Sequence, residues 1–512
     1  MAIVLERHDQ LDLSQYRRVA LEREAVAVAP ALLSDVAGSR AALLGYLESG
    51  AQAYGVNTGL GYLASRTVED VDQAAFQRAI LAGRATGIGR PLSEAVVRGA
   101  MLLRLTGFLG GYAGVSPELC GFLVDRLNDQ WYPVVPGGVS GAAGEIVPLA
   151  HLFGTLVGDG SVFVDGRVVP AERALTVPPF SLGAKEGIAL INGAPLAPAL
   201  AAPLLLRADA LLEHATLCGA LVVAVTRASA RPYVVRVGEL KGDPGQLAIH
   251  RRLSTLLAGP ARRLEDARQA PVSLRVIPQV HGAALDALGH LRAQLDRELR
   301  AVTDSPVFVG ASRAGEDAEP EGLYPTGNFH AQALTLLVDS AGVALTQVLN
   351  LLEKRLHRLL DSRFSGLPDQ LTRDPGRHSG VVTLHKQVIG LVAQARGLAA
   401  PATIHALDAS TGQEDIQAFT LLAAQQLDGI LDALELALAH ELVALRQARF
   451  LVGTPLPAPL ERTASLLADT VAPVTEDRSL AADVSSVREL VASGQLIGGV
   501  RCPSIWFSPT PG

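Results

Sequence analysis

Five long segments with apolar residues at intervals of three or four dominate the 512-residue sequence from about residue 201 onward. That spacing places apolar side chains along one face of a helix, and several segments far exceed the usual helix of about eleven or twelve residues. Long helices without an intervening sheet are typical of antiparallel bundles. The sequence therefore predicts a mainly α protein built on a long antiparallel helix bundle. The five segments are residues 205–227, 282–302, 329–364, 380–398 and 414–451.

Little of the sequence predicts β-structure. Residues 161–171 alternate around Asp165 and Gly166, a pattern typical of a short hairpin, and they are the only convincing β-signal. We therefore expect a small mixed N-terminal region over residues 1–200 and a central bundle over 201–451. A C-terminal part over 452–512 begins with the proline-rich linker GTPLPAPLE and continues into a helix near 484–494.

The run ALELALAHELVAL (433–445) is apolar around almost the whole circumference of a helix. A helix of this kind is buried on every side, which in a soluble protein usually means packing against other copies. The sequence therefore predicts an oligomer.

Composition excludes several classes of function. The net charge of −7 comes with no basic stripe, so a nucleic-acid partner is not expected. The first ten residues carry both acids and bases, unlike a signal peptide, and the apolar run 188–206 is broken by Asn192, glycine and three prolines, unlike a membrane span. The cysteines are odd in number, far apart and without metal-ligand spacing. We expect a cytoplasmic protein without a metal site; the cysteines are Cys120, Cys218 and Cys502.

A glycine-rich run, PGGVSGAAGEIVPLAH (136–151), leads into an apolar stretch that can form a helix. Four glycines in its first nine residues indicate tight turns, positive φ or close backbone approach. A loop of this kind at the start of a helix can build a site. Composition alone nevertheless favours a plain connection between two helices.

Six stretches together change that interpretation. The sequence resembles the aromatic amino acid lyase family, which includes the histidine and phenylalanine ammonia-lyases, over roughly residues 40–450. The resemblance implies the long-helix fold of that family, a homotetramer with sites shared between chains, and elimination of an amine from a small amino-acid substrate. The stretches are YGVNTGLG (54–61), the glycine-rich run, KEGIALINGAP (185–195), VSLRVIPQVHGA (272–283), TGNFHAQ (326–332) and STGQEDIQ (410–417).

Three residues in these stretches have a structural and a functional interpretation. Tyr54 could simply pack, or its hydroxyl could move a proton. Asn192 could pair with local backbone or bind a ligand, and Arg275 could pair with a structural carboxylate or clamp a substrate carboxylate. The resemblance implies the functional roles: Tyr54 as the base that removes the β-proton, and Asn192 and Arg275 at the amino-acid end of the substrate. It also places Phe329 near the substrate ring.

Glu414 is expected to open a long helix, where a carboxylate favours the positive end of the helix dipole. The resemblance implies a further role, because histidine-type members carry glutamate here and a carboxylate suits an imidazole N–H. Lys386 is one helical turn beyond Val382, so it is either a surface charge or a cation beside Glu414 in the pocket. Arg84 stands where histidine-type members have a histidine.

The glycine-rich run departs from the family at one decisive position. In the family an Ala-Ser-Gly triad cyclises into a methylidene-imidazolone, but this chain has Ala142, Ala143 and Gly144. Ala143 has no hydroxyl to lose as water, so the methylidene group is not expected and the loop is interpreted as a vestigial prosthetic-group loop. Val272 replaces a family tyrosine close to that group.

Three hypotheses follow. In the first, the substrate is a trimethylammonium betaine of ergothioneine or hercynine type, whose amine leaves without help from the electrophile, as in the family member ergothionase. In the second, the protein is a histidine ammonia-lyase in a serine-to-alanine form. In the third, it is an inactive paralogue that serves as a binding protein. We prefer the first. Val272 and Arg84 speak against a serine-to-alanine change made to trap a complex, because such a change would leave the neighbouring residues intact. The retention of Tyr54, Asn192, Arg275 and Glu414 together speaks against loss of activity. None of the three needs a metal or a soluble cofactor.

Overall fold

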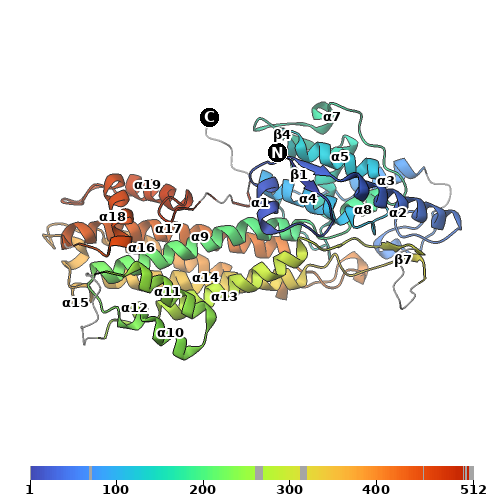
Figure 1. Ribbon diagram of the computed structural model, residues 1–512. Coiled ribbons are helices and arrows are strands. Elements are labelled where there is room, and N and C mark those ends of the chain that lie inside the picture. Colours follow the sequence, from blue (N-terminus) through green and yellow to red (C-terminus); the bar gives the residue numbers. More distant parts are fainter. Residues whose placement is uncertain are drawn as a thin grey trace.

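The computed structural model describes residues 2–68, 72–259, 269–311, 320–453, 455–499, 501 and 504–506. A mixed N-terminal region lies at one end of an elongated bundle of long helices (Figure 1). The mainly α prediction is confirmed.

The N-terminal region consists of helices of 4 to 19 residues around very small sheets. Its hairpin is confirmed: β4 and β5 pair antiparallel, with Val164 opposite Arg167 across the Asp165–Gly166 turn. Sequence analysis missed three other pairs, parallel β1–β2 and antiparallel β3–β4 and β6–β7, because strands of two or three residues are too short to show an alternating pattern. The strands are β1 (Ile3–Leu5), β2 (Val26–Val28), β3 (Tyr132–Pro133), β4 (Ser161–Val164), β5 (Arg167–Pro170), β6 (Val307–Val309) and β7 (Gly322–Tyr324). The helices are α1 (Leu13–Ala20), α2 (Pro30–Glu48), α3 (Gln73–Ala82), α4 (Glu94–Leu109), α5 (Pro117–Asn128), α6 (Ile146–Gly154), α7 (Ala171–Ala174) and α8 (Glu186–Ile191).

Five long helices form the bundle, as the periodicity predicts. They are α9 (Leu196–Val225), α13 (Ile277–Glu298), α14 (Gln332–Leu359), α16 (Val382–Leu398) and α17 (Thr420–Val452). Helix α9 begins well before the predicted residue 205. Pro198 falls in its first turn, where the missing N–H has no helical partner anyway, and Pro203 is accommodated inside the helix.

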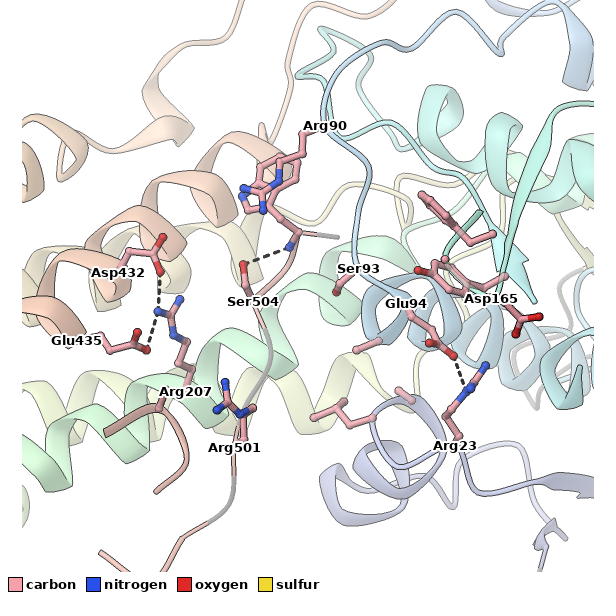
Figure 2. A pocket seen from close by; sticks show the side chains of 18 of the residues that line it. Arg23, Arg90, Ser93, Glu94, Asp165, Arg207, Asp432, Glu435, Arg501 and Ser504 are labelled. Atoms are coloured by element: carbon pink, nitrogen blue, oxygen red, sulfur yellow. Dashed lines mark hydrogen bonds and ion pairs between the residues drawn. The ribbon is translucent and has the colours of Figure 1, made fainter. Parts of the chain in front are cut away.

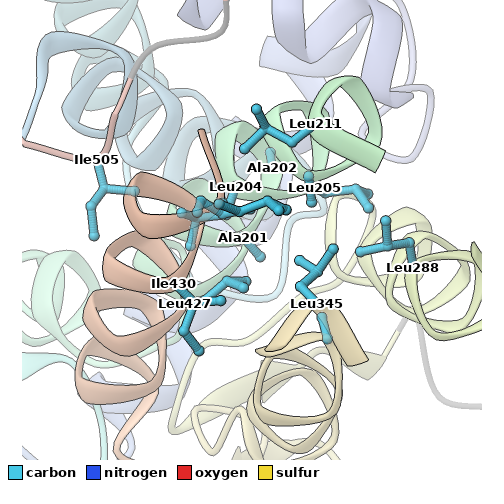
Figure 3. Close-up of a cluster of buried hydrophobic side chains, with 14 of the residues drawn as sticks. Ala201, Ala202, Leu204, Leu205, Leu211, Leu288, Leu345, Leu427, Ile430 and Ile505 are labelled. Atoms are coloured by element: carbon cyan, nitrogen blue, oxygen red, sulfur yellow. The ribbon is translucent and has the colours of Figure 1, made fainter. Parts of the chain in front are cut away.

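Contacts between buried polar side chains fix the directions of these helices. Arg355 of α14 binds Glu441 of α17 at 2.9 Å and contacts His281 of α13 at 3.3 Å, and His281 bonds Thr216 of α9 at 2.9 Å. A second contact, Arg292 with Asp209, shows that α13 runs opposite to α9. Likewise Thr335 bonds Thr420 at 2.7 Å, so α14 and α17 run the same way. Apolar side chains fill the space between these polar contacts and the N-terminal region, including Leu204, Leu288, Leu345 and Ile430 (Figure 3).

Segment 433–445 lies in α17 and is almost entirely buried within a single chain, by α9, α14, α16 and α19. Its apolar circumference is therefore covered without a second copy, so this segment gives no evidence of oligomerisation. The helices that border the bundle are α10 (Val235–Lys241), α11 (Pro244–Leu256), α12 (Val272–Arg275), α15 (Ser362–Ser365), α18 (Ala458–Thr470) and α19 (Ala481–Ala492).

Two helical stretches, Glu186–Val225 and Gln332–Leu359, are long and apolar enough to cross a membrane. However, 94% and 61% of their most apolar windows are buried inside the protein. Their apolar character is therefore used for internal packing.

The C-terminal segment returns to the N-terminal region. Trp506 pairs with Leu92 in an isolated β-bridge, and the Ser93 N–H donates to the Ile505 carbonyl at 2.8 Å. The Trp506 ring lies against Gly137, where an added Cβ would come within 2.4 Å of it. The helix predicted near 484–494 is confirmed as α19, whereas α18 was missed. The division at residues 200 and 451 stays a prediction, although α9 begins before residue 201.

Candidate active site

The glycine-rich loop lines a cavity of about 680 Å³ at the junction of the N-terminal region and the bundle. Ala143 and Gly144 form part of its wall, immediately before α6. A cavity of this size holds a small amino-acid-like molecule. The structure brings together five other predicted site residues around it: Tyr54, Arg84, Asn192, Phe329 and Glu414.

Glu414 contacts the loop directly. Its Oε2 accepts a hydrogen bond of 2.7 Å from the Ala143 N–H. The expectation that Glu414 opens a long helix is wrong. Its backbone pairs with Ala409 in an isolated β-bridge, and α17 begins only at Thr420, after Phe419 takes a left-handed conformation with φ of 51°. Because Glu414 lies outside the helix, its carboxylate can reach the glycine-rich loop.

Tyr54 is half-buried in the wall of the same cavity. Its hydroxyl oxygen accepts a hydrogen bond of 2.9 Å from the Gly61 N–H. Gly61 has φ of +56°, a conformation that glycine adopts without a steric penalty. The glycine-punctuated stretch therefore folds back so that its own backbone holds the tyrosine oxygen in place.

Asn192 ends α8 and faces the segment that contains Pro306. Its Nδ2 donates to the Ser305 carbonyl at 2.7 Å, while Arg104 donates to the Asn192 carbonyl at 3.4 Å. Asn192 therefore pairs with backbone, but its partner Ser305 is distant in the sequence and not local. This pairing fixes the plane of the amide in the cavity wall, which also suits an orienting role.

Phe329 packs directly on the loop. A Cβ added to Gly144 would lie 3.2 Å from the Phe329 ring, so glycine allows the close approach. Arg84 follows α3, is half-buried and lines the cavity on the side of Tyr54. Arg84 is thus part of the cavity wall, whereas its role in binding stays a prediction.

A layer of buried charges supports the cavity, and sequence analysis did not find it. Lys185 donates to Asp304 at 2.8 Å, and Arg104 lies 3.9 Å from the same carboxylate. Burial raises the pKa of Asp304 and lowers that of Lys185, with each partner opposing the shift of the other. Because an isolated buried charge is costly, each of these residues needs its partners. Part of the signal was present: Lys185 opens the family-like stretch 185–195 as a charge before an apolar sequence.

Glu145 joins the loop to the bundle. Its two carboxylate oxygens accept hydrogen bonds of 2.6 Å from the Leu196 and Ala197 N–H groups, at the start of α9. Loss of hydration raises the pKa of Glu145 to about 8, against the opposing effect of these N–H groups and of Arg104. The loop is thereby anchored to a helix start.

Two predicted site residues do not reach this cavity. Arg275 ends the short helix α12, and its Nε donates to the Ala270 carbonyl at 2.9 Å. Lys386 is exposed near the start of α16. Helix α12 lies at the end of the bundle far from the N-terminal region (Figure 1). The predicted pairing of Lys386 with Glu414 is therefore not made within one chain.

A second cavity of about 740 Å³ lies between the C-terminal segment, α9, α17 and the N-terminal region (Figure 2). Several of its charges form ion pairs: Arg207 binds Asp432 at 2.6 Å and Glu435 at 3.0 Å, and Arg23 lies 2.6 Å from Glu94. None of the predicted site residues lines it. Its internal ion pairs indicate a structural junction.

Comparison with known proteins identifies the family of this chain. Residues 11–471 match the family model described as aromatic amino acid lyase. The chain is 34% identical over 503 residues to the histidine ammonia-lyase of Stigmatella aurantiaca, and the match covers 96% of this chain and 97% of the relative.

Solved structures show the same fold. Tyrosine aminomutase from Streptomyces globisporus matches with a TM-score of 0.90 and 28% identity, covering 97% of this chain and 98% of the other. Ergothionase from Treponema denticola, in complex with desmethyl-ergothioneine sulfonic acid, matches with a TM-score of 0.90 and 24% identity, covering 97% and 100%. At that identity the ergothionase likeness shows the fold alone. The family match and the full-length relative together show that this chain belongs to the aromatic amino acid lyase family, as a carbon–nitrogen lyase of the ammonia-lyase type.

Proposed function

We propose that the chain eliminates trimethylamine from the betaine of an imidazole-type amino acid, of the ergothioneine or hercynine kind, to give a urocanate-like acrylate. One observation carries the proposal: the cavity keeps Tyr54, Asn192 and Glu414 around a loop whose central residue is Ala143. A methylidene-imidazolone does not fit this loop, because residue 143 has no hydroxyl to lose. The substrate must therefore carry an amine that departs without the help of an electrophile.

A trimethylammonium group meets that need. Its nitrogen has no lone pair with which to attack an electrophile, and it departs as a neutral amine. The C–N electron pair leaves with the nitrogen, the β C–H electrons form the new double bond, and the proton passes to the oxygen of deprotonated Tyr54. The product double bond conjugates with the ring.

The other residues have positioning roles in this proposal. Glu414 accepts a hydrogen bond from the imidazole, and Asn192 orients the carboxylate end of the substrate. Phe329, which lies against Gly144 in the cavity wall, packs on the substrate ring. Arg84 supplies a positive charge to a ring substituent.

Arg275 and Lys386 complete the site from other copies of the chain, which requires a homotetramer with shared sites. Both residues lie away from the cavity of their own chain, and Val272 in the same short helix is 59% exposed. Arginine suits the carboxylate because its guanidinium can bind both oxygens. Lys386 brought beside Glu414 would provide a cation for a sulfur on the ring.

A second candidate is histidine elimination with release of ammonia. The full-length similarity to a histidine ammonia-lyase supports it. Ammonia is a poor leaving group, so this reaction needs an electrophile. Ala143 cannot provide one. A third candidate, an inactive binding protein, is disfavoured because Tyr54, Asn192 and Glu414 still share one cavity.

Incubation with histidine, hercynine and ergothioneine in separate reactions tests these candidates. The measurements are the ultraviolet absorbance of the conjugated acrylate and the trimethylamine released. We expect turnover of a betaine with stoichiometric trimethylamine. Turnover of histidine alone would establish the second candidate, and silence with all three would refute elimination from imidazole substrates.

Tyr54→Phe provides the matched test of the base. It should lower kcat by about 10²-fold to 10⁴-fold, the usual contribution of a general base. Tyr132→Phe serves as the control, because Tyr132 lines the second cavity and not the first. Equal activity of the two variants would contradict the role of Tyr54.

A further inference from the structure

Two helices of the bundle place a compact group of metal-ligating side chains together, outside the cavity described above. Glu353 and His357 are one turn apart on α14, and His385 belongs to the neighbouring helix α16. The ligand atoms of the three residues all lie within 4.8 Å of one another. Spacing along the sequence could not reveal this group, because its third member is contributed by a different helix.

The group is partly organised already. His385 Nε2 lies 2.7 Å from Glu353 Oε1, and the rings of His357 and His385 stack with centroids 4.7 Å apart and planes at 20°. Lys354 Nζ lies 2.7 Å from the other oxygen, Glu353 Oε2. Glu353 is only 5% exposed, so its carboxylate is held in place. Held ligands of this kind lose little freedom on binding a metal.

His357 distinguishes this arrangement from an ordinary histidine–carboxylate pair. A hydrogen bond between His385 and Glu353 needs no second imidazole. Within the described residues, the stacked ring of His357 makes no hydrogen bond, so its ring nitrogens are available. The surplus imidazole beside a buried carboxylate is the observation that points to a ligand.

We infer that Glu353, His357 and His385 form a binding site for a divalent transition metal, with Zn²⁺ as the ion best suited to it. Two imidazoles and one carboxylate are a common zinc ligand set, with a fourth position left to water. Zinc bonds of about 2.0–2.2 Å in a tetrahedron put ligand atoms roughly 3.3 Å apart. His385 Nε2 and Glu353 Oε1 are now 2.7 Å apart and all the ligand atoms lie within 4.8 Å of one another, so the side chains must shift to take up tetrahedral positions around an ion. His385 binds through Nε2 once its proton resides on Nδ1.

The bound ion would tie the first turns of α16 to the last turns of α14. Lys386 directly follows His385 in α16, so the metal would fix the segment that carries this lysine. The inference stands independently of the proposed substrate, because it concerns ion binding and local stability.

Titration of chelator-treated full-length protein with Zn²⁺ in a calorimeter tests the site. We expect about one ion per chain and a rise in melting temperature at saturation. His357→Ala and His385→Ala should each weaken binding by about 10-fold or more. His290→Ala, an exposed histidine on helix α13, is the matched control and should bind zinc as the parent protein does.

His357 is exposed, so His357→Ala is expected to fold. A loss of zinc binding in this variant would therefore not be a result of unfolding. Glu353→Gln offers a second variant that preserves shape while removing the charged ligand. Failure to bind zinc, or equal affinity in His357→Ala, His385→Ala and His290→Ala, would overturn the inference. X-ray absorption at the zinc edge should show nitrogen and oxygen neighbours; a sulfur neighbour would place the ion elsewhere.

Discussion

The Ala143 N–H donates a 2.7 Å hydrogen bond to the Glu414 carboxylate, joining two positions 271 residues apart. Glu414 thereby has one oxygen on the loop, and Oε1 remains for a ligand in the cavity. One carboxylate can therefore hold both the wall of the site and the ring that enters it.

Glu414→Gln should separate these two uses. The amide oxygen can still accept from Ala143, but the negative charge that favours an imidazole N–H is lost. Since hydrogen bonds to charged groups contribute about 1.5–3 kcal/mol, kcat/KM should fall on the order of 10-fold to 100-fold. Asp415→Asn, at the exposed neighbouring position, is the control and should leave kcat/KM unchanged. Unaltered kcat/KM in Glu414→Gln would mean that Glu414 only supports the loop.

Active sites shared between chains can be tested by co-expressing two chains that carry different inactivating substitutions. Tyr54→Phe and Arg275→Ala chains should each be inactive alone, yet co-expressed hybrids should recover part of the activity, because some sites combine intact residues from different chains. Tyr54→Phe with Asn192→Ala is the matched control: both residues line the cavity of one chain, so no recovery is expected. Absence of recovery in the first pair, with assembled hybrids present, would argue against shared sites.

Glu145 predicts a pH dependence of stability. Its pKa is raised from 4.5 to about 8 in the folded protein, so the folded state binds more protons than the unfolded state between these values. The free energy of unfolding should therefore fall as pH rises from about 4.5 to 8. Melting temperatures at pH 6 and pH 9 would show the loss. In Glu145→Gln this part of the decrease should be absent; an equal decrease would assign it to other groups.

The buried pair in the bundle predicts a large effect on stability. Arg355 and Glu441 are both wholly buried and lie 2.9 Å apart. Arg355→Met leaves the Glu441 charge uncompensated and should cost about 3–5 kcal/mol. Adding Glu441→Leu should restore much of that loss, because no lone charge then remains. Denaturant unfolding of the single and double variants measures both; a double variant less stable than the single would contradict this explanation.

Periodicity predicted the bundle because apolar spacing reports burial directly. It could not place Glu414 correctly, since a carboxylate before an apolar helix has the same sequence pattern whether it caps the helix or turns away from it. The prolines at 198 and 203 delayed the predicted start of α9, although one falls where no backbone bond is lost.

Family-like stretches located Tyr54, Asn192, Phe329 and Glu414, which do share one cavity. Arg275 and Lys386 do not line that cavity. In the proposed function other copies of the chain supply them, which a motif in one chain cannot reveal. Lys185 and Asp304 were overlooked because a buried ion pair is defined by a contact between segments that are separate in sequence.

The contact between Trp506 and Gly137 has a consequence for biosynthesis. Gly137 belongs to the loop that carries Ala143, and its carbonyl also accepts a bond of 2.6 Å from Gln425 in α17. The loop therefore depends on Gln425 and Trp506, which are both synthesised long after Gly137. Until then the loop lacks two of its supports, so the nascent chain should have no finished site to offer a substrate.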